Sequence, residues 1–210
     1  MSTVLHIQAS ERGDESFSIR LAQAFLRSYL ELHPRDSIKT LSLGKNTIPE
    51  FGALAISAKY RILHGNSSSE EEALVWKAVE AAIEDFKNAQ KLVISSPMWN
   101  FGIPYRLKQY FDVIVQPGYT FSYSPQEGYQ GLVTGRPAML IMARGGEYAP
   151  GTEAAAYDFQ RPYLESILSF IGFTKIDSII VEPTLQAGPE VASQKLAEAI
   201  STAREKAKNF

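Results

Sequence analysis

The chain has 210 residues, 45% of them hydrophobic, which is enough for one well-buried domain and short for two of average size. Its 21 basic residues are scattered among 23 acidic ones, so neither nucleic acid nor an anionic membrane is indicated as a partner. The absence of cysteine excludes disulfides, thiolate catalysis and iron–sulfur clusters. Because no secretory pattern and no long apolar run is present, we expect a single cytoplasmic domain over residues 1–210.

Five short runs rich in β-branched residues alternate with longer segments of helical period. The runs cover residues 3–8, 37–43, 91–96, 137–143 and 175–182. Strands that alternate with helices predict an α/β fold, here a three-layer, doubly wound parallel sheet of five strands. The third and fourth runs are almost continuously apolar, as burial by helices on both faces requires, so we place them in the middle of the sheet.

Helical periodicity predicts five helices along the same chain. They cover residues 16–32, residues 69–87, a short segment through Leu107, Phe111 and Ile114, a segment through Phe159 and Phe170 that stops at Gly172, and a last helix that begins at Gly188. Ser69 and Glu72 have the spacing of a capping box. Residues 44–68 carry no motif and are expected to form an irregular surface excursion or a mobile loop. Residues 119–133 are expected to form an inserted hairpin.

In an open parallel sheet, ligands bind beyond the carboxyl ends of the strands. Three of the expected loops lie at that edge, and they cover residues 9–18, 97–104 and 143–152. Topology alone therefore predicts a binding site made by these loops, before any motif is considered.

The first loop places the hydroxyls of Ser10, Ser16 and Ser18 around the start of a helix. A helix N-terminus with neutral donors suits a phosphate. Because both GxxxxGK[ST] and GxGxxG are absent, a monophosphate fits better than a triphosphate or a dinucleotide. The alternative is that Ser16 or Ser18 is merely a helix cap. Arg12 either reaches the phosphate or lies in solvent.

The second loop, "SSPMWNFGIPYRLKQYFD" at 95–112, is rigid and aromatic. Pro97 and Pro104 restrict the backbone on either side of Met98–Phe101. Trp99 and Phe101 offer flat surface, and Asn100 offers the donor and acceptor that the edge of a heterocycle needs. The alternative is that the two aromatic side chains only pack against helices.

The third loop, "ARGGEY" at 143–148, contains two consecutive glycines. Gly145 and Gly146 allow close approach of the backbone to a planar ligand, although such a pair is more often only a turn. Taken alone, Arg144 is either a counter-charge to a ligand or, more often for such a residue, a surface side chain.

The second loop, together with "GYTFSY" and "GLVTGRPAMLIMARGG", resembles the FMN-dependent NADH-azoreductases and quinone reductases of the flavodoxin-like proteins over nearly the whole chain. The resemblance implies strand order 2-1-3-4-5 and a homodimer with shared active sites. It also implies FMN as cofactor and NADH or NADPH as co-substrate. The implied FMN contacts are Ser10, Ser16, Phe17 and Ser18 at the phosphate, Met98, Trp99, Asn100 and Phe101 along the ring, and Ala143, Arg144, Gly145 and Gly146 on its pyrimidine side.

The hypothesis is an oxidoreductase that passes two electrons, as hydride, from NAD(P)H through FMN to a quinone or azo acceptor in a ping-pong reaction. Because the cofactor carries the chemistry, no catalytic side chain and no metal is expected, with assistance at most from Asn100, Gly145 and Gly146. Phe121 and Tyr123 are expected to stack planar substrates.

Two alternatives belong to other classes of protein. An electron-transfer flavodoxin binds FMN without an NADH site of its own, but its chain is usually smaller and markedly acidic. A response-regulator-type protein needs an acidic phosphoacceptor cluster at the strand ends, and Glu11 and Asp14 alone do not make one.

Overall fold

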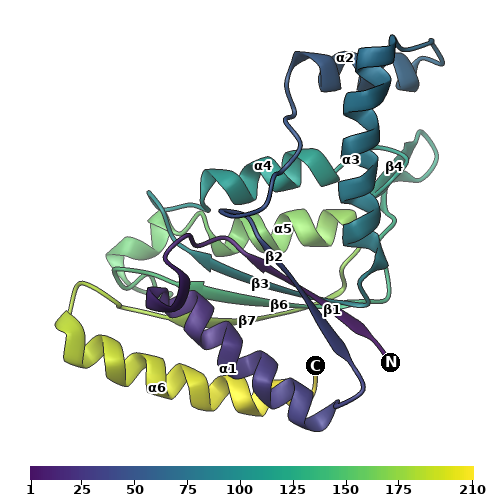
Figure 1. The fold of residues 1–210 in the computed structure, drawn as a ribbon. Coiled ribbons are helices and arrows are strands. Elements are labelled where there is room, and N and C mark those ends of the chain that lie inside the picture. The colour runs from purple at the N-terminus through teal and green to yellow at the C-terminus, as the bar shows by residue number, and fades with distance from the viewer.

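The computed structural model describes all residues 1–210 and contains a parallel sheet of five strands with helices on both faces (Figure 1). The strands are β1 (Thr3–Gln8), β2 (Ser37–Ser42), β3 (Lys91–Pro97), β6 (Pro137–Ala143) and β7 (Lys175–Val181). Their order is β2-β1-β3-β6-β7, which is 2-1-3-4-5 when only the strands of this sheet are counted. The two most apolar strands, β3 and β6, are neighbours and neither lies at an edge.

Two apolar layers cover the sheet. Helices α1 (Phe17–Leu32) and α6 (Gly188–Ala207) lie on one face, and α3 (Glu70–Asn88), α4 (Tyr105–Ile114) and α5 (Arg161–Ile171) lie on the other (Figure 1). Successive side chains of a strand point to opposite faces. Val93 therefore packs with α1 and α6, whereas Leu92 and Ile94 pack with the other three helices. No helix among them has the combination of length and apolar character that a membrane crossing requires.

Two helix ends predicted from the sequence, the start of α3 and the end of α5, lie at the predicted residues. The Ser69 hydroxyl accepts a hydrogen bond from the Glu72 amide at 3.2 Å, and the Glu72 carboxylate accepts one from the Ser69 amide at 2.7 Å. This confirms the capping box at the start of α3. Helix α5 ends at Gly172, whose φ of 116° lies in the left-handed region that favours glycine.

The expectation of a wholly irregular segment over 44–68 is wrong, because α2 (Ala53–Leu63) lies within it. Only Ala55 and Ala58 of this helix are buried, so it has no stripe of large apolar residues for periodicity to detect. Its attachment to α3 is polar. The Glu72 carboxylate accepts hydrogen bonds from Ser57 at 2.6 Å and from Arg61 at 3.0 Å. Hydrogen bonds from Ser57 and the Ser69 amide lower the pKa of Glu72 to about 2.

The segment between α4 and β6 contains an antiparallel hairpin, β4 (Phe121–Ser124) and β5 (Gly128–Gly131). It packs on the C-terminal end of α5, where the rings of Phe121 and Phe170 have their centroids 4.8 Å apart. A Cβ atom on Gly131 would lie 2.3 Å from the main-chain nitrogen of Gly172, so glycine is required there. Since β7 starts just after this point, the hairpin lies at the opposite end of the sheet from the carboxyl ends of the strands (Figure 1).

Candidate functional site

The loops after β1, β3 and β6 lie side by side at the carboxyl edge of the sheet. The Ala9 amide donates to the Ser95 carbonyl at 2.9 Å, and the Met98 amide donates to the Ala143 carbonyl at 2.8 Å. A cavity of about 200 Å³ opens among them. Its lining residues are Ser10, Arg12, Ser16, Phe17, Pro97, Met98, Trp99, Ala143, Gly145, Thr184 and Leu185. All three loops predicted from topology therefore contribute to one site.

Thr184 and Leu185 were missed by the reasoning from sequence. They follow β7, the fifth strand of the sheet, whose carboxyl end lies at the same edge. The topological rule that selected the other three loops would have selected this one as well.

The three serines of the first loop form a buried cluster at the start of α1. Ser10 and Ser16 are each 4% exposed and Ser18 is fully buried. Ser16 occupies the position before the helix, but its hydroxyl bonds the Ser18 hydroxyl at 3.1 Å instead of a helix amide. Ser16 is therefore the N-cap residue of α1, as the alternative held, but its hydroxyl caps no helix amide. The amides of the first turn have no partner within the helix, so hydroxyls and amides are together available to an anion.

Residues 99–102 form a tight turn that the sequence did not predict. Trp99 and Gly102 exchange two main-chain hydrogen bonds, both at 3.0 Å. Between them, Asn100 has φ 46° and Phe101 has φ 69°, which is the pattern of a type I′ turn. Asparagine tolerates this conformation, but phenylalanine there costs about 1–2 kcal/mol. Backbone strain beside a cavity indicates a functional constraint on this turn.

The aromatic side chains of the turn are not core residues, so the packing alternative is wrong. Trp99 is 41% exposed and Phe101 is 44% exposed. The Phe101 ring lies 5.1 Å from the ring of Tyr157, and the Trp99 ring lies 6.4 Å from that of Tyr105. Trp99 lines the cavity among the loops and also a hollow of about 710 Å³, to which Asn100 contributes. Flat aromatic surface is therefore presented on the open side of the site.

The Gly145–Gly146 turn leaves two amides unused. Neither glycine donates its N–H to another group of the chain, whereas the Gly145 carbonyl accepts from Leu185 at 3.0 Å and from Gln186 at 2.9 Å. A Cβ atom on Gly145 would lie 3.1 Å from the side chain of Leu185. Because these two residues have no side chains, a ligand can approach the backbone closely and accept hydrogen bonds from its two free N–H groups.

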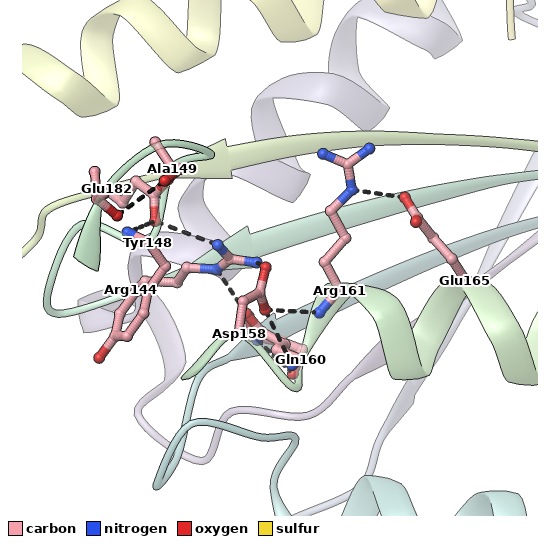
Figure 2. Close-up of polar contacts among 10 residues, drawn as sticks. Arg144, Tyr148, Ala149, Asp158, Gln160, Arg161, Glu165 and Glu182 are labelled. Carbon is pink, nitrogen blue, oxygen red and sulfur yellow. Dashed lines mark hydrogen bonds and ion pairs between the residues drawn. The ribbon is translucent and has the colours of Figure 1, made fainter. Parts of the chain in front are cut away.

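Arg144 is buried and only 2% exposed. The interpretation of it from the sequence alone as a surface side chain is therefore wrong. The guanidinium bonds Gln160 at 3.1 Å, Asp158 at 2.7 Å and Glu182 at 3.3 Å (Figure 2). Its partners are 14 to 38 residues away along the chain, so no local pattern signals its burial.

Phe121 and Tyr123 are the predicted residues that the structure does not bring to this site. Both belong to β4, at the far end of α5. The structure also brings together no group of three or more His, Asp or Glu side chains that could hold a metal ion.

The geometry fits a ligand with a phosphate at one end and a planar heteroaromatic ring at the other. Buried hydroxyls and helix amides of the first loop suit the phosphate. Unused amides at Gly145 and Gly146, together with the exposed aromatic rings of the second loop, suit the ring.

Comparison with known proteins agrees with this geometry. The model of a family described as having a flavodoxin-like fold matches residues 2–207. A protein of Nitratidesulfovibrio vulgaris named FMN-dependent NADH:quinone oxidoreductase is 51% identical over 210 residues, with both chains covered completely. The crystal structure of an azoreductase from Bacillus anthracis strain Sterne superposes with a TM-score of 0.92 at 33% identity, with 100% of each chain covered. An FMN-dependent NADH-azoreductase from Bacillus anthracis strain Ames Ancestor, solved in complex with FMN, superposes with a TM-score of 0.87 at 29% identity, covering 99% of this chain and 100% of that one. The chain therefore belongs to the flavodoxin-like family that contains the FMN-dependent NADH:quinone oxidoreductases.

Proposed function

We propose that this protein is an FMN-dependent oxidoreductase that reduces quinones and aromatic azo compounds with NADH or NADPH. The observation that carries the proposal is the union of a buried serine cluster and two unused glycine amides at one edge of the sheet. The relatives support it, since one is named an FMN-dependent NADH:quinone oxidoreductase and two solved structures are azoreductases.

In this proposal the site binds FMN at its phosphate and at its ring. The phosphate is bound by the hydroxyls of Ser10, Ser16 and Ser18 and by the amides at the start of α1, and Phe17 lies beside them. Residues 98–101 would lie along the isoalloxazine ring, and residues 143–146 would lie on its pyrimidine side. Because both turns are already formed, little ordering would be required when the cofactor binds.

Bound FMN supplies the redox chemistry, by accepting a hydride from the nicotinamide and passing two electrons to the acceptor. The side chains and amides of the protein have supporting roles. The N–H groups of Gly145 and Gly146, which have no partner in the chain, would stabilise the negative charge that reduction creates near the pyrimidine. The Asn100 amide orients the ring edge, and Trp99 with Phe101 shields the site from water and stacks planar acceptors.

We further propose a ping-pong reaction, in which both substrates use the open side of the site beside Trp99 in turn. The oxidised nicotinamide leaves before the acceptor binds. Double-reciprocal plots at several fixed acceptor concentrations should give parallel lines. Intersecting lines would show that both substrates are bound together and would contradict this order.

The remaining predicted residues suggest a homodimer with shared sites. Within one chain, Phe121 and Tyr123 lie at the opposite end of the sheet from the cavity, and Tyr123 is 62% exposed. They can stack a substrate only in the site of a second copy. Sedimentation should show a dimer, and mixing the inactive variants Tyr123→Ala and Asn100→Ala should restore part of the activity. A fully active monomer would reject the shared site.

A spectrum of the purified protein tests the central proposal. We expect a yellow protein, or one that turns yellow and binds FMN on addition, and whose absorbance NADH bleaches without oxygen. A protein that ignores FMN would refute flavin binding altogether. A yellow protein that neither NADH nor NADPH bleaches would instead be a flavodoxin. Rates with quinones and azo dyes then identify the preferred acceptor.

A further inference from the structure

Arg144 is the most voluminous of the fully buried side chains, and the proposed flavin contacts do not use its guanidinium. A buried charge is costly unless it is paired and hydrogen-bonded. Its presence next to the Gly145–Gly146 turn therefore requires a reason beyond packing.

The guanidinium connects three segments of the chain (Figure 2). Its Nε donates to Gln160 at 3.1 Å and its Nη2 to Asp158 at 2.7 Å, both at the entrance to α5. Its Nη1 donates to Glu182 at 3.3 Å, just after β7. The planar fork of arginine can hold such divergent acceptors at once, whereas the point charge of lysine cannot.

Each of these segments is in turn bonded to a turn of the site. The side-chain amide of Gln160 donates to the Ser96 carbonyl at 3.2 Å. The main-chain amide of Phe159 donates to the Phe101 carbonyl at 3.0 Å. The Glu182 carboxylate also accepts from the Tyr148 amide at 3.1 Å. The cluster therefore holds the aromatic turn and the glycine turn relative to each other.

The cluster also removes Arg144 as a counter-charge. One guanidinium meets two carboxylates, Asp158 and Glu182, whose side chains are each 14% exposed against 1% for the arginine. The sum of these three charges is negative. The positive charge of the arginine is therefore neutralised behind the glycine amides.

We propose that Arg144 is a positioning residue that locks the two ring-binding turns in place, while Asp158 and Glu182 cancel its charge. Neutral amides, and not the guanidinium, then meet the charge of the reduced ring. The inference rests on the proposed binding of FMN. It assigns to Arg144 a role through Gly145 and Gly146 and not a contact with the cofactor.

The first test compares Arg144→Lys with the control Arg161→Lys. Arg161 lies close by and pairs with Glu165 at 2.7 Å, but these two side chains are 45% and 37% exposed (Figure 2). We expect the FMN dissociation constant of the apoprotein to rise at least tenfold in Arg144→Lys and to stay unchanged in Arg161→Lys. Hydrogen exchange of the Phe159 and Leu185 amides in the apoprotein should also quicken only in Arg144→Lys.

The second test measures a property that a purely structural residue would not alter. Glu182→Gln keeps the shape of the side chain and removes one negative charge beside Arg144. The midpoint potential of bound FMN should rise above that of the wild type, because the cluster loses one negative charge and a less negative surrounding favours the reduced flavin. The matched control Glu165→Gln should keep the wild-type potential.

The outcomes separate the two proposals. Wild-type protein that does not bind FMN would refute the proposed function. Wild-type protein that binds FMN, with Arg144→Lys equal to it in affinity and exchange, would overturn the positioning role alone. If Arg144→Lys does not fold, Asp158→Asn takes its place, and unchanged FMN affinity in that variant overturns the role. An unchanged or lowered potential in Glu182→Gln overturns the cancellation of charge.

Discussion

His6 should make the stability of this protein depend on pH. It lies in the centre of β1, is 2% exposed, and its Nε2 is hydrogen-bonded to the Ser95 hydroxyl at 3.0 Å. Burial lowers the pKa of His6 from 6.5 to about 4. We expect acidification from about pH 7 to about pH 5 to destabilise the wild type, and His6→Gln to lose most of this dependence.

The direction and the size of this change in stability follow from the number of protons bound by the folded and the unfolded chain. Between pH 6.5 and about pH 4 the unfolded chain holds a proton on His6 that the folded chain does not, so stability falls as the pH falls. At about 1.4 kcal/mol per pKa unit, the full loss below this window is about 3.4 kcal/mol. About 1.8 kcal/mol of it occurs between pH 7 and pH 5. The lowered pKa values of Glu72 and Asp36 act at lower pH, so this interval isolates the histidine.

Urea unfolding followed by the fluorescence of buried Trp76 provides the measurement. Wild type, His6→Gln and the exposed control His64→Gln are unfolded at both pH values under the same FMN concentration. The control should keep the wild-type difference. If His6→Gln loses as much stability as the wild type between the two pH values, the assignment of the effect to His6 is wrong.

Four further predictions concern the two turns of the site, the hairpin and the serine cluster. Gly145→Ala should stay within about 1 kcal/mol of wild-type stability, because its methyl meets only an exposed leucine side chain at 3.1 Å, yet it should weaken FMN binding measured by fluorescence quenching. Gly131→Ala, with its methyl 2.3 Å from main chain, should cost about 1–3 kcal/mol or more in thermal unfolding; equal stability of these two variants would contradict the geometry. Ser18→Ala should weaken FMN binding about tenfold and leave riboflavin binding unchanged, since a hydrogen bond to a charged group contributes about 1.5–3 kcal/mol; equal losses for both ligands would place the phosphate elsewhere. Asn100→Gly should keep stability within about 0.5 kcal/mol, because glycine accepts φ 46°, while its FMN affinity falls; unchanged affinity would remove the amide from the site.

Much of the fold was readable from local patterns. Alternating strand and helix periods predicted the parallel sheet, and the apolar character of β3 and β6 placed them inside it. The capping box at Ser69 and the stop at Gly172 depend on residues within one turn of a helix, and both are where the sequence marks them. Helix α2 escaped detection because its buried face consists of two alanines and its attachment to α3 is polar.

Some features of the site could likewise be predicted from the sequence, and others could not. That three loops meet at the carboxyl edge follows from topology, because parallel strands all end at that edge. The strained turn at Asn100 and Phe101 did not follow, since prolines on either side limit the backbone without specifying its φ values. The distance of Phe121 from the cavity did not follow either, because it depends on where the hairpin packs along α5.

The sequence by itself determined the alternation of elements, the edge of the sheet at which a ligand site is expected and the residue types available there. All of these are set by periodicity, caps and chain order, which act between near neighbours. Only the tertiary structure decided that Arg144 is buried, that the Ser16 hydroxyl pairs with Ser18, and that the amides of Gly145 and Gly146 remain free. These outcomes depend on burial and on which polar groups meet in the folded chain, and for Arg144 the partner Glu182 is 38 residues away.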